Sequence, residues 1–285
     1  MQPIFNYNLI ESFRARAVVK NNQNADFILK YIAEDFKERL LTVDRIFDKA
    51  LELHGHTGAV AHAVMQSGKV KAIERAETHI GFVEKEHLLH REILNLPKQS
   101  FDLIVSPLSL QMVNDVPGVL MQINQALKPD SLFLGMMAGN GTLNELRESL
   151  LQAESEIYGG VSPRIYPFAD VRDVGALLQR AGFSMPVTDI ENLNVRYKTM
   201  FDLMQDLRNM GMQNALLHKS RYPVSRRFFN RAAQIYAERF SDPDGKIRAT
   251  FSFIALSGWS AGESQQKPMK PGTAQVSLKD VLENK

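Results

Sequence analysis

The sequence predicts an α/β fold in which a mostly parallel sheet carries helices on both faces. Two observations point to it: short, nearly continuous apolar runs, and amphipathic stretches that alternate with them from Asp44 onward. Strands of a parallel sheet are buried on both faces, so they are apolar along their whole length. Alternation of such strands with helical patterns is typical of repeated strand–helix–strand units. The expected strands are residues 49–53, 70–73, 101–106, 131–137 and 248–259.

Helical periodicity accounts for the stretches around these strands. Residues 1–45 carry apolar side chains at helical spacing with charged residues between them. The helix expected at residues 116–127 ends before Pro129, which lacks the backbone donor that a continuing helix needs. Thr142 and Glu145 have the spacing of a capping box and predict the start of another helix. Further helices are expected at residues 58–66, 170–181, 199–210 and 228–236.

The charge balance and the residue types exclude several classes of protein. Among 285 residues, 34 Lys and Arg face 32 Asp and Glu, so the formal net charge is +2. Such a balance gives no case for binding to nucleic acid or to a membrane surface. Cysteine is absent, which excludes disulfides and zinc–thiolate sites. No apolar run reaches the roughly 18 residues that predict a membrane span, and we expect a cytoplasmic protein.

One turn carries the strongest functional signal. Residues 50–58 read Ala-Leu-Glu-Leu-His-Gly-His-Thr-Gly and join the first expected strand to the next helix. In a nucleotide-binding turn, glycines allow the chain to reverse and let backbone amides approach the ligand. His54 and His56 stand at two positions where such a turn has glycine. Glu74 follows Glu52 by 22 positions, close to the interval of roughly 20 residues expected for an acid that binds ribose hydroxyls.

Together with two later segments, this turn resembles the class I S-adenosylmethionine (SAM)-dependent methyltransferases, which have a Rossmann-like fold. Residues 101–115 are similar to the family's fourth-strand motif, and residues 127–135 to its turn into the fifth strand. The resemblance implies a mostly parallel seven-stranded sheet with an N-terminal helical cap and an antiparallel final strand. It also implies SAM as the cofactor, lying across the carboxyl ends of the strands with Glu74 on the ribose.

A closer resemblance covers nearly the whole chain. Residues 141–147, 153–163 and 177–183 are similar to the methyltransferase-like assembly factors of respiratory complex I. Members of that branch are thought to hydroxylate an arginine of a complex I subunit. The malonyl-carrier-protein methyltransferases of biotin synthesis are more distant relatives. The resemblance therefore implies a protein substrate, with a complex I subunit as the candidate partner.

The family's roles can be carried onto this chain residue by residue. Histidine adopts a left-handed backbone conformation more readily than most residues, so His54 and His56 are compatible with the turn. Their imidazoles fill volume that glycine leaves to the ligand, and the sequence leaves open whether SAM binds despite them. The expected cofactor-binding residues are Glu52, Leu53, His54, Gly55, His56, Gly58, Glu74, Arg75, His90, Ser106 and Leu108.

Three residues are candidates for substrate binding: Arg147, Tyr158 and Tyr166. For Arg147 the alternative is a surface ion pair. The two tyrosines flank a loop rich in glycine and proline, where they either form part of a lid or anchor the loop. The histidines of the turn and His62 also raise the question of a metal site. Their spacing matches no standard set of ligands, and we expect no metal.

The expected organisation is a helical cap (residues 1–45), a methyltransferase-like domain (46–260) with lid insertions at 140–170 and 195–245, and a flexible tail (261–285). Two functions stay open. The first is an enzyme that modifies a protein substrate by methylation or by arginine hydroxylation. The second is a degenerate SAM fold that serves as an assembly or scaffolding factor without catalysis. No residue stands out as a general base, but methyl transfer mainly needs alignment of its reactants.

Overall fold

Six strands form one sheet in the computed structural model, which describes residues 2–20, 22, 25–83, 88–220, 223–263 and 265. Their order across the sheet is β2-β1-β3-β4-β6-β5. The pairings of β1 with β2 and β3, and of β3 with β4, are parallel, whereas β6 runs antiparallel to both β4 and β5. The mostly parallel sheet and the antiparallel final strand are thus confirmed. The strands are β1 (Ala50–Leu53), β2 (Ile73–Ala76), β3 (Phe101–Pro107), β4 (Leu127–Ala138), β5 (Ser184–Tyr197) and β6 (Ile247–Trp259).

The expectation of seven strands was wrong for the described residues. The segment between β2 and β3 contains one isolated bridge within itself, Glu77 with Leu88, and its described part forms no further strand. Proline cannot donate to a ladder, and Pro97 interrupts the segment. Conversely, β5 was not expected. Residues 184–196 are all half-buried or exposed, as is usual in an edge strand. The sequence therefore has no continuous apolar run there that would predict a strand.

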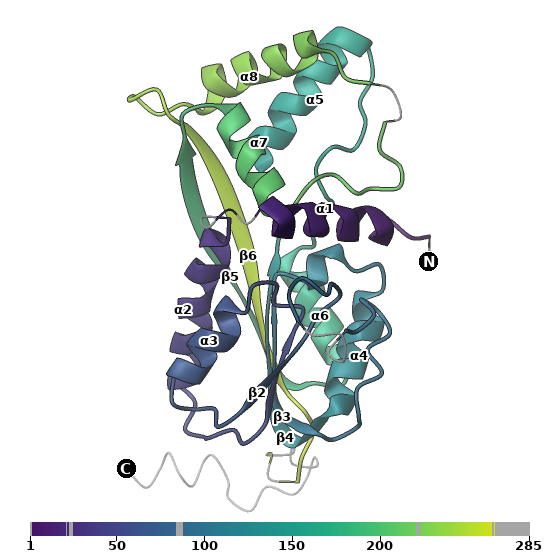
Figure 1. Ribbon diagram of the computed structural model, residues 1–285, viewed down its shortest axis with the longest axis vertical. Coiled ribbons are helices and arrows are strands. Elements are labelled where there is room, and N and C mark those ends of the chain that lie inside the picture. Colours follow the sequence, from purple (N-terminus) through teal and green to yellow (C-terminus); the bar gives the residue numbers. More distant parts are fainter. Residues whose placement is uncertain are drawn as a thin grey trace, which may run out of the picture.

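Helices cover both faces of the sheet. On one face α2 packs against α3, and on the other α4 packs against α6 (Figure 1). Phe36 and Val64 of the first pair lie in one hydrophobic core, and Ile123 and Leu178 of the second pair lie in the other. The apolar faces that the periodicity predicted are therefore the faces that touch the sheet. These helices are α2 (Phe27–Leu41), α3 (Ala59–Gln66), α4 (Val116–Ala126) and α6 (Val171–Arg180).

The remaining long helices lie beyond the carboxyl edge of the parallel strands. Figure 1 shows α1 (Tyr7–Lys20) lying across that edge, and α1 packs against α7. Helix α1 buries Ile10 and also Arg14, and a fully buried arginine is rare unless it is paired. Farther out, α5 (Asn144–Tyr158) packs against α8 (Arg226–Phe240), with α7 (Met200–Asn209) beside them.

Two local expectations were wrong. The strand expected at residues 70–73 begins instead at Ile73 and runs to Ala76, while Val70 makes only an isolated bridge with Phe47. The edge strand β2 contains Glu74 and Arg75, so its apolar pattern is weaker than that of the residues before it. This shift of three residues moves the end of the strand, which decides which acid lies at the nucleotide site.

The capping box at the start of α5 was the second error. The residue before the helix is Leu143, in a left-handed conformation with φ 54°, and no side chain caps it. The Thr142 hydroxyl donates instead to the backbone carbonyl of Ser252 at 2.7 Å. The Glu145 carboxylate accepts the backbone N–H of Thr250. Both side chains therefore bind α5 to β6 and leave the helix terminus uncapped.

The other expected helices are confirmed. The helical character of residues 1–45 is divided between α1 and α2, and Asp170 and Thr199 cap α6 and α7 with their side chains. No helix within the described ranges is long and apolar enough to cross a membrane. The tail expected at residues 261–285 lies almost wholly outside the described residues.

Candidate functional site

The turn after β1 keeps the backbone of a nucleotide-binding turn even though two of its glycines are replaced. His54 and His56 adopt φ 56° and 59°, in the left-handed region that favours glycine. Gly58, with φ 81°, precedes the first residue of α3. Left-handed backbone costs an ordinary residue roughly 1–2 kcal/mol, so the surrounding contacts must hold both histidines in place.

Those contacts converge on Glu52 and Arg75. The carboxylate of Glu52, fully buried in β1, accepts the backbone N–H of Ala61 in α3 at 2.8 Å and the Arg75 guanidinium at 2.7 Å. Arg75 also donates to the backbone carbonyls of His56 (2.7 Å) and Phe82 (3.1 Å). Burial raises the pKa of Glu52 above its ordinary value, against the opposing effect of Arg75. Arg75 thus holds the turn against β2.

Gly55 shows why this turn still needs one glycine. A Cβ atom there would lie 2.2 Å from the Glu52 carboxyl carbon, far inside van der Waals contact. The φ of Gly55 is not positive. The glycine therefore makes room for a buried carboxylate, whereas the two histidines take the strained conformations.

The acid at the end of β2 is Glu77. Ala76 pairs with Leu53 as the last residue of each strand, so Glu77 and His54 are the first residues beyond the carboxyl edge. Glu77 is fully buried and one of its oxygens accepts the backbone N–H of His56. Its other oxygen lies 2.7 Å from the guanidinium of Arg14, which is 1% exposed. Neither Arg14 nor Glu77 was expected at the site; a correct end for β2 would have indicated Glu77.

Glu74 and His90 lie away from this arrangement. Glu74 pairs with Leu51 in the middle of β2, roughly 10 Å of strand before Glu77. Its side chain is 48% exposed and forms an ion pair with Lys49. His90 is exposed and accepts the backbone N–H groups of its own loop through Nδ1. The structure brings neither of them to the turn, and the residue that follows the end of β2 is Glu77.

The two histidines of the turn are buried among cationic groups. His54 is 2% exposed and His56 is 5% exposed. Burial, reinforced by Arg91 and Arg14, lowers the pKa of both imidazoles well below the ordinary value, so both are neutral at neutral pH. His56 Nδ1 lies 3.0 Å from the Arg14 guanidinium, which fits a neutral ring that accepts a hydrogen bond. Within the described chain, the Nε2 atom of His54 has no hydrogen-bond partner.

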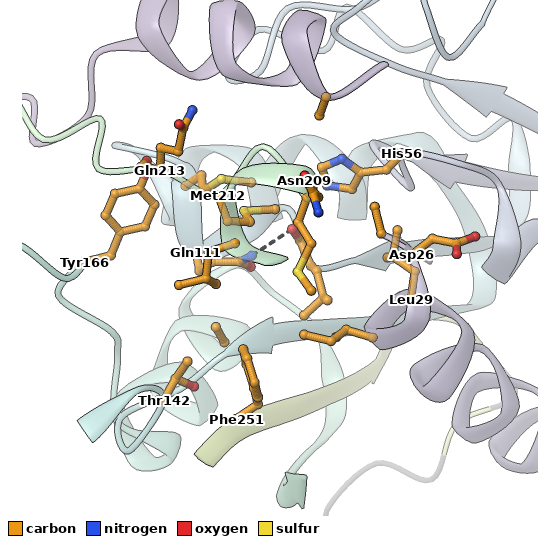
Figure 2. Close-up of a pocket in the computed structure, with 18 of the residues that line it drawn as sticks. Asp26, Leu29, His56, Gln111, Thr142, Tyr166, Asn209, Met212, Gln213 and Phe251 are labelled. Carbon is orange, nitrogen blue, oxygen red and sulfur yellow. Dashed lines mark hydrogen bonds between the residues drawn. The ribbon is translucent and has the colours of Figure 1, made fainter. Parts of the chain in front are cut away.

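An open cavity lies beside this turn, over the carboxyl ends of β3 and β4. Its volume is about 460 Å³ and its wall is mostly apolar, with Phe251 and Phe253 of β6 on one side. In Figure 2, His56, Gln111 and Asn209 point towards the same space. The segments that follow β1, β2 and β3 contribute His56, Thr57, Phe82, Leu108, Gln111 and Met112 to the wall. Ala17 and Val18 of α1, Tyr166, Asn209 at the end of α7, and Met212 and Gln213 complete this part of it.

Gln111 has a fixed orientation at the edge of this cavity. Leu108, directly after β3, has φ 49°, and its carbonyl accepts the Gln111 side-chain N–H at 2.7 Å (Figure 2). The Gln111 carbonyl oxygen is buried and has no hydrogen-bond partner among the residues that the structure describes. A buried, unpaired acceptor lowers the stability of the folded protein, so it indicates a place where a ligand donor belongs.

Ser106, also expected at the site, is fully buried, and its hydroxyl forms a hydrogen bond with that of Ser109.

The three residues expected to bind substrate lie at different distances from the cavity. Tyr166 lines the cavity, and its hydroxyl donates to the Gln213 carbonyl at 2.7 Å; burial raises its pKa to about 12. Arg147 lies behind it and donates to the Tyr166 carbonyl at 3.0 Å. Tyr158 is 49% exposed and bonds to Ser225, away from the cavity. Tyr158 therefore anchors a loop in this conformation, and Tyr166 alone of the three lines the cavity.

No group of three or more His, Cys, Asp or Glu side chains is placed to hold a metal ion within the described residues. His62, raised as a possible ligand, bonds to Gln66 on the exposed side of α3.

The nucleotide half of the site, as it lies, does not fit SAM. Both oxygens of Glu77 are engaged by protein donors, one by the backbone of His56 and the other by Arg14. The ribose hydroxyls of a bound nucleotide need the acid at this strand end as their acceptor. In addition, the imidazoles of His54 and His56 are buried in the turn that glycine would leave open. The cavity over β3 and β4 remains open to a ligand.

Comparison with known proteins agrees with this fold and refines it. Residues 23–186 match the family model described as "Methyltransferase domain". The chain is 38% identical over 270 residues to a protein of Rattus norvegicus named "Arginine-hydroxylase NDUFAF5, mitochondrial", covering 90% of this chain and 77% of the relative. It is 37% identical to the human protein of the same name, covering 90% and 76%. A malonyl-[acyl-carrier protein] O-methyltransferase of Halorhodospira halophila is 26% identical, covering 88% and 87%.

Solved structures show the same fold at low sequence identity. The YcgJ protein of Bacillus subtilis superimposes with a TM-score of 0.53 at 16% identity, covering 80% of this chain and 98% of that one. A putative methyltransferase of Bacillus halodurans gives a TM-score of 0.53 at 10% identity, covering 79% and 97%. The expected class I SAM-dependent methyltransferase fold is thereby confirmed. The chain belongs to the methyltransferase-domain family and, within it, to the group of proteins named arginine-hydroxylase NDUFAF5.

Proposed function

We propose that this protein acts on an arginine of a protein substrate, and that the substrate is a subunit of respiratory complex I. Two lines support the proposal. Two relatives, 38% and 37% identical to this chain, are named arginine hydroxylases, and residues 141–147, 153–163 and 177–183 resemble complex I assembly factors. The observation that carries it is the unpaired carbonyl oxygen of Gln111 at the open cavity.

A guanidinium is the donor that this cavity suits. It presents five N–H groups and accepts nothing, so it would satisfy the Gln111 oxygen. The methylene stem of arginine packs well on apolar surface, and the phenylalanines of β6 provide such a wall. A volume of about 460 Å³ lies within the range of roughly 300–1,000 Å³ usual for small-ligand sites. One arginine side chain of a bound protein segment fits that space.

SAM and the cellular location are part of the proposal. The methyltransferase domain supports SAM as the nucleotide ligand, bound when Glu77 is released from its protein partners. We further propose a cytoplasmic protein, as the sequence predicts. Since the relatives' names include the word mitochondrial, fractionation of the source cell is the check: recovery with mitochondria would overturn this part.

Mass spectrometry of complex I tests the main proposal. Complex I is purified from source cells that express the wild-type chain, that lack it, or that carry Gln111→Met, and the arginine-containing peptides are compared. The expected result is one arginine whose added mass disappears without the chain and falls in the variant. An added oxygen atom would identify hydroxylation and an added methylene unit would identify methylation. Identical arginine masses in all three samples, with complex I assembly lost only when the chain is absent, would instead establish a scaffolding factor without catalysis.

A further inference from the structure

Helix α1 brings one charged side chain into the nucleotide half of the site. Arg14 is 1% exposed and Glu77, which it meets at 2.7 Å, is fully buried. The two residues are 63 positions apart in the chain, so the pairing exists only because α1 crosses the carboxyl edge. One guanidinium nitrogen of Arg14 donates to one Glu77 oxygen, and a ribose hydroxyl of a bound nucleotide would donate to the acid at this strand end in the same way.

The rest of the Arg14 guanidinium is also held inside the site. It reaches His56 Nδ1 at 3.0 Å and donates to the hydroxyl of Thr78. Its carbon lies 4.9 Å from the ring centre of Phe82, within the range of cation–π contact. Arg14 therefore touches the turn after β1, the end of β2 and the loop beyond β2, which are the three parts that surround a nucleotide in a Rossmann-like site.

We propose that Arg14 occupies the ribose position of the nucleotide site and that α1 competes with SAM for Glu77. The inference rests on the proposed function only in taking SAM as the nucleotide. SAM then binds when Arg14 leaves Glu77, and α1 is the element that must move. The wall of the cavity over β3 and β4 includes neither Glu77 nor Arg14, but it includes Ala17 and Val18 of α1 and also His56 and Phe82, so a movement of α1 changes this wall as well.

Removing the competing donor tests the proposal directly. Arg14→Met keeps the length of the side chain and removes its donors; calorimetry with SAM and with adenosine should show at least about ten-fold tighter binding than to the wild type. Arg16→Met, on an exposed position of the same helix, should leave both affinities unchanged. Adding Glu77→Gln to Arg14→Met should remove most of the gain, because one neutral amide oxygen then replaces the two charged acceptor oxygens. Unchanged or weaker binding to a folded Arg14→Met protein overturns the proposal.

The histidines of the turn provide the competing explanation. His54→Gly with His56→Gly removes both imidazoles and leaves Arg14 in place, so we expect less gain in SAM affinity than from Arg14→Met. A full gain from the two glycines, with none from Arg14→Met, would show that the imidazoles close the site and would refute the role of Arg14.

Two further measurements keep the test decisive if Arg14→Met does not fold. Arg14→Lys keeps the positive charge, but its single nitrogen cannot contact Glu77, His56 and Thr78 together as the guanidinium does, so its SAM affinity should still rise; no rise counts against the proposal. In the wild type at saturating adenosine, backbone hydrogen exchange in residues 7–20 should increase as α1 leaves the edge. Bound adenosine without such an increase also refutes it. These readouts measure nucleotide affinity and the position of α1, so they are independent of whether an arginine is modified.

Discussion

The carboxyl edge of the sheet has two halves that differ in what fills them. Over β1 and β2 the chain places its own charged groups, with Arg14 and Glu77 buried as an ion pair beside His54. Over β3, β4 and β6 it leaves a cavity of about 460 Å³ with a mostly apolar wall. Both halves belong to one fold, so the fold alone does not determine ligand binding. The side chains that follow each strand end determine it.

The largest effect is expected when Glu77, the buried acid over β1 and β2, is removed. Glu77→Ala leaves the buried Arg14 with only the partly exposed Glu11, 3.8 Å away, as a carboxylate partner, and loss of one partner of a buried pair costs about 3–5 kcal/mol. Urea denaturation should show that loss in the free energy of unfolding. Glu148→Ala is the matched control: Glu148 pairs with Arg239 at 2.6 Å, but both are about half exposed, so about 1 kcal/mol or less is expected. Equal losses in the two variants would contradict the buried pair.

The second prediction concerns the turn that separates the halves. Gly55→Ala places a Cβ atom 2.2 Å from the Glu52 carboxyl carbon, which must shift away from the N–H of Ala61. Overpacking of this kind costs about 2 kcal/mol, measurable as a lower midpoint of thermal unfolding. A Cβ at Gly160 meets no atom within 4 Å, so Gly160→Ala should leave the midpoint nearly unchanged. A tolerated Gly55→Ala would mean that the Glu52 carboxylate is not confined as described.

The third prediction concerns the stability of the folded protein at low pH, where His54 of the turn is the group of interest. Burial holds the pKa of His54 well below its ordinary value of 6.5, so below that pH the unfolded chain binds a proton that the folded chain does not. Stability therefore falls as the pH drops below 6.5, by up to about 1.4 kcal/mol per pH unit for each such histidine.

His54→Asn isolates this contribution, because asparagine tolerates positive φ and does not titrate. Glu52, whose pKa is raised, contributes with the opposite sign but equally in both proteins. Denaturation at a series of pH values below 6.5 should give a smaller slope for the variant. Equal slopes would show that His54 is protonated in the folded chain.

The smallest expected effect belongs to the open half. Gln111→Met keeps the side-chain volume and removes the unpaired carbonyl oxygen, so an arginine-containing peptide should bind about five-fold more weakly, a loss near 1 kcal/mol. The free energy of unfolding should change by no more than about 1 kcal/mol, since one hydrogen bond to Leu108 is lost. Isothermal calorimetry measures the first and urea denaturation the second. A peptide with lysine in place of arginine is the ligand control. Undiminished binding to Gln111→Met would remove Gln111 from the arginine site.

Much of the fold could be predicted because its signals are local. The apolar runs of β1, β3 and β4 and the periodic faces of α4 and α6 are present in the sequence itself. The left-handed conformations of His54 and His56 also follow from a local rule, since the turn demands positive φ and histidine tolerates it.

The expected position of β2 was wrong for an identifiable reason. The apolar residues at positions 70–73 favour a strand there, but the pairing with β1 selects residues 73–76, which include Glu74 and Arg75. Edge strands need little apolar character, so the backbone pairing with β1, and not the apolar pattern of residues 70–73, determines where β2 lies. Glu77 then replaced Glu74 at the strand end.

The pairing of Arg14 with Glu77 was beyond prediction from local patterns. It depends on the path of α1 over the sheet, which no spacing in residues 7–20 specifies. Arginine is also expected at the surface, so nothing in the sequence marks Arg14 as buried. Long-range contacts of this kind are visible only once the elements are assembled.

The strand β6 links the cavity to the outer helices. Residues 253–257 and Trp259 pair with both neighbours, but residues 247–252 pair with β5 alone, so a two-stranded ribbon extends past the sheet. Helices α5, α7 and α8 pack on this ribbon (Figure 1), and Phe251 and Phe253 at its base form part of the cavity wall. Two strands bend and twist more easily than six. We therefore expect the outer helices to move as the ribbon bends at this base. The bending of the ribbon, rather than the size of any single side chain, would then limit how large a segment can enter the cavity.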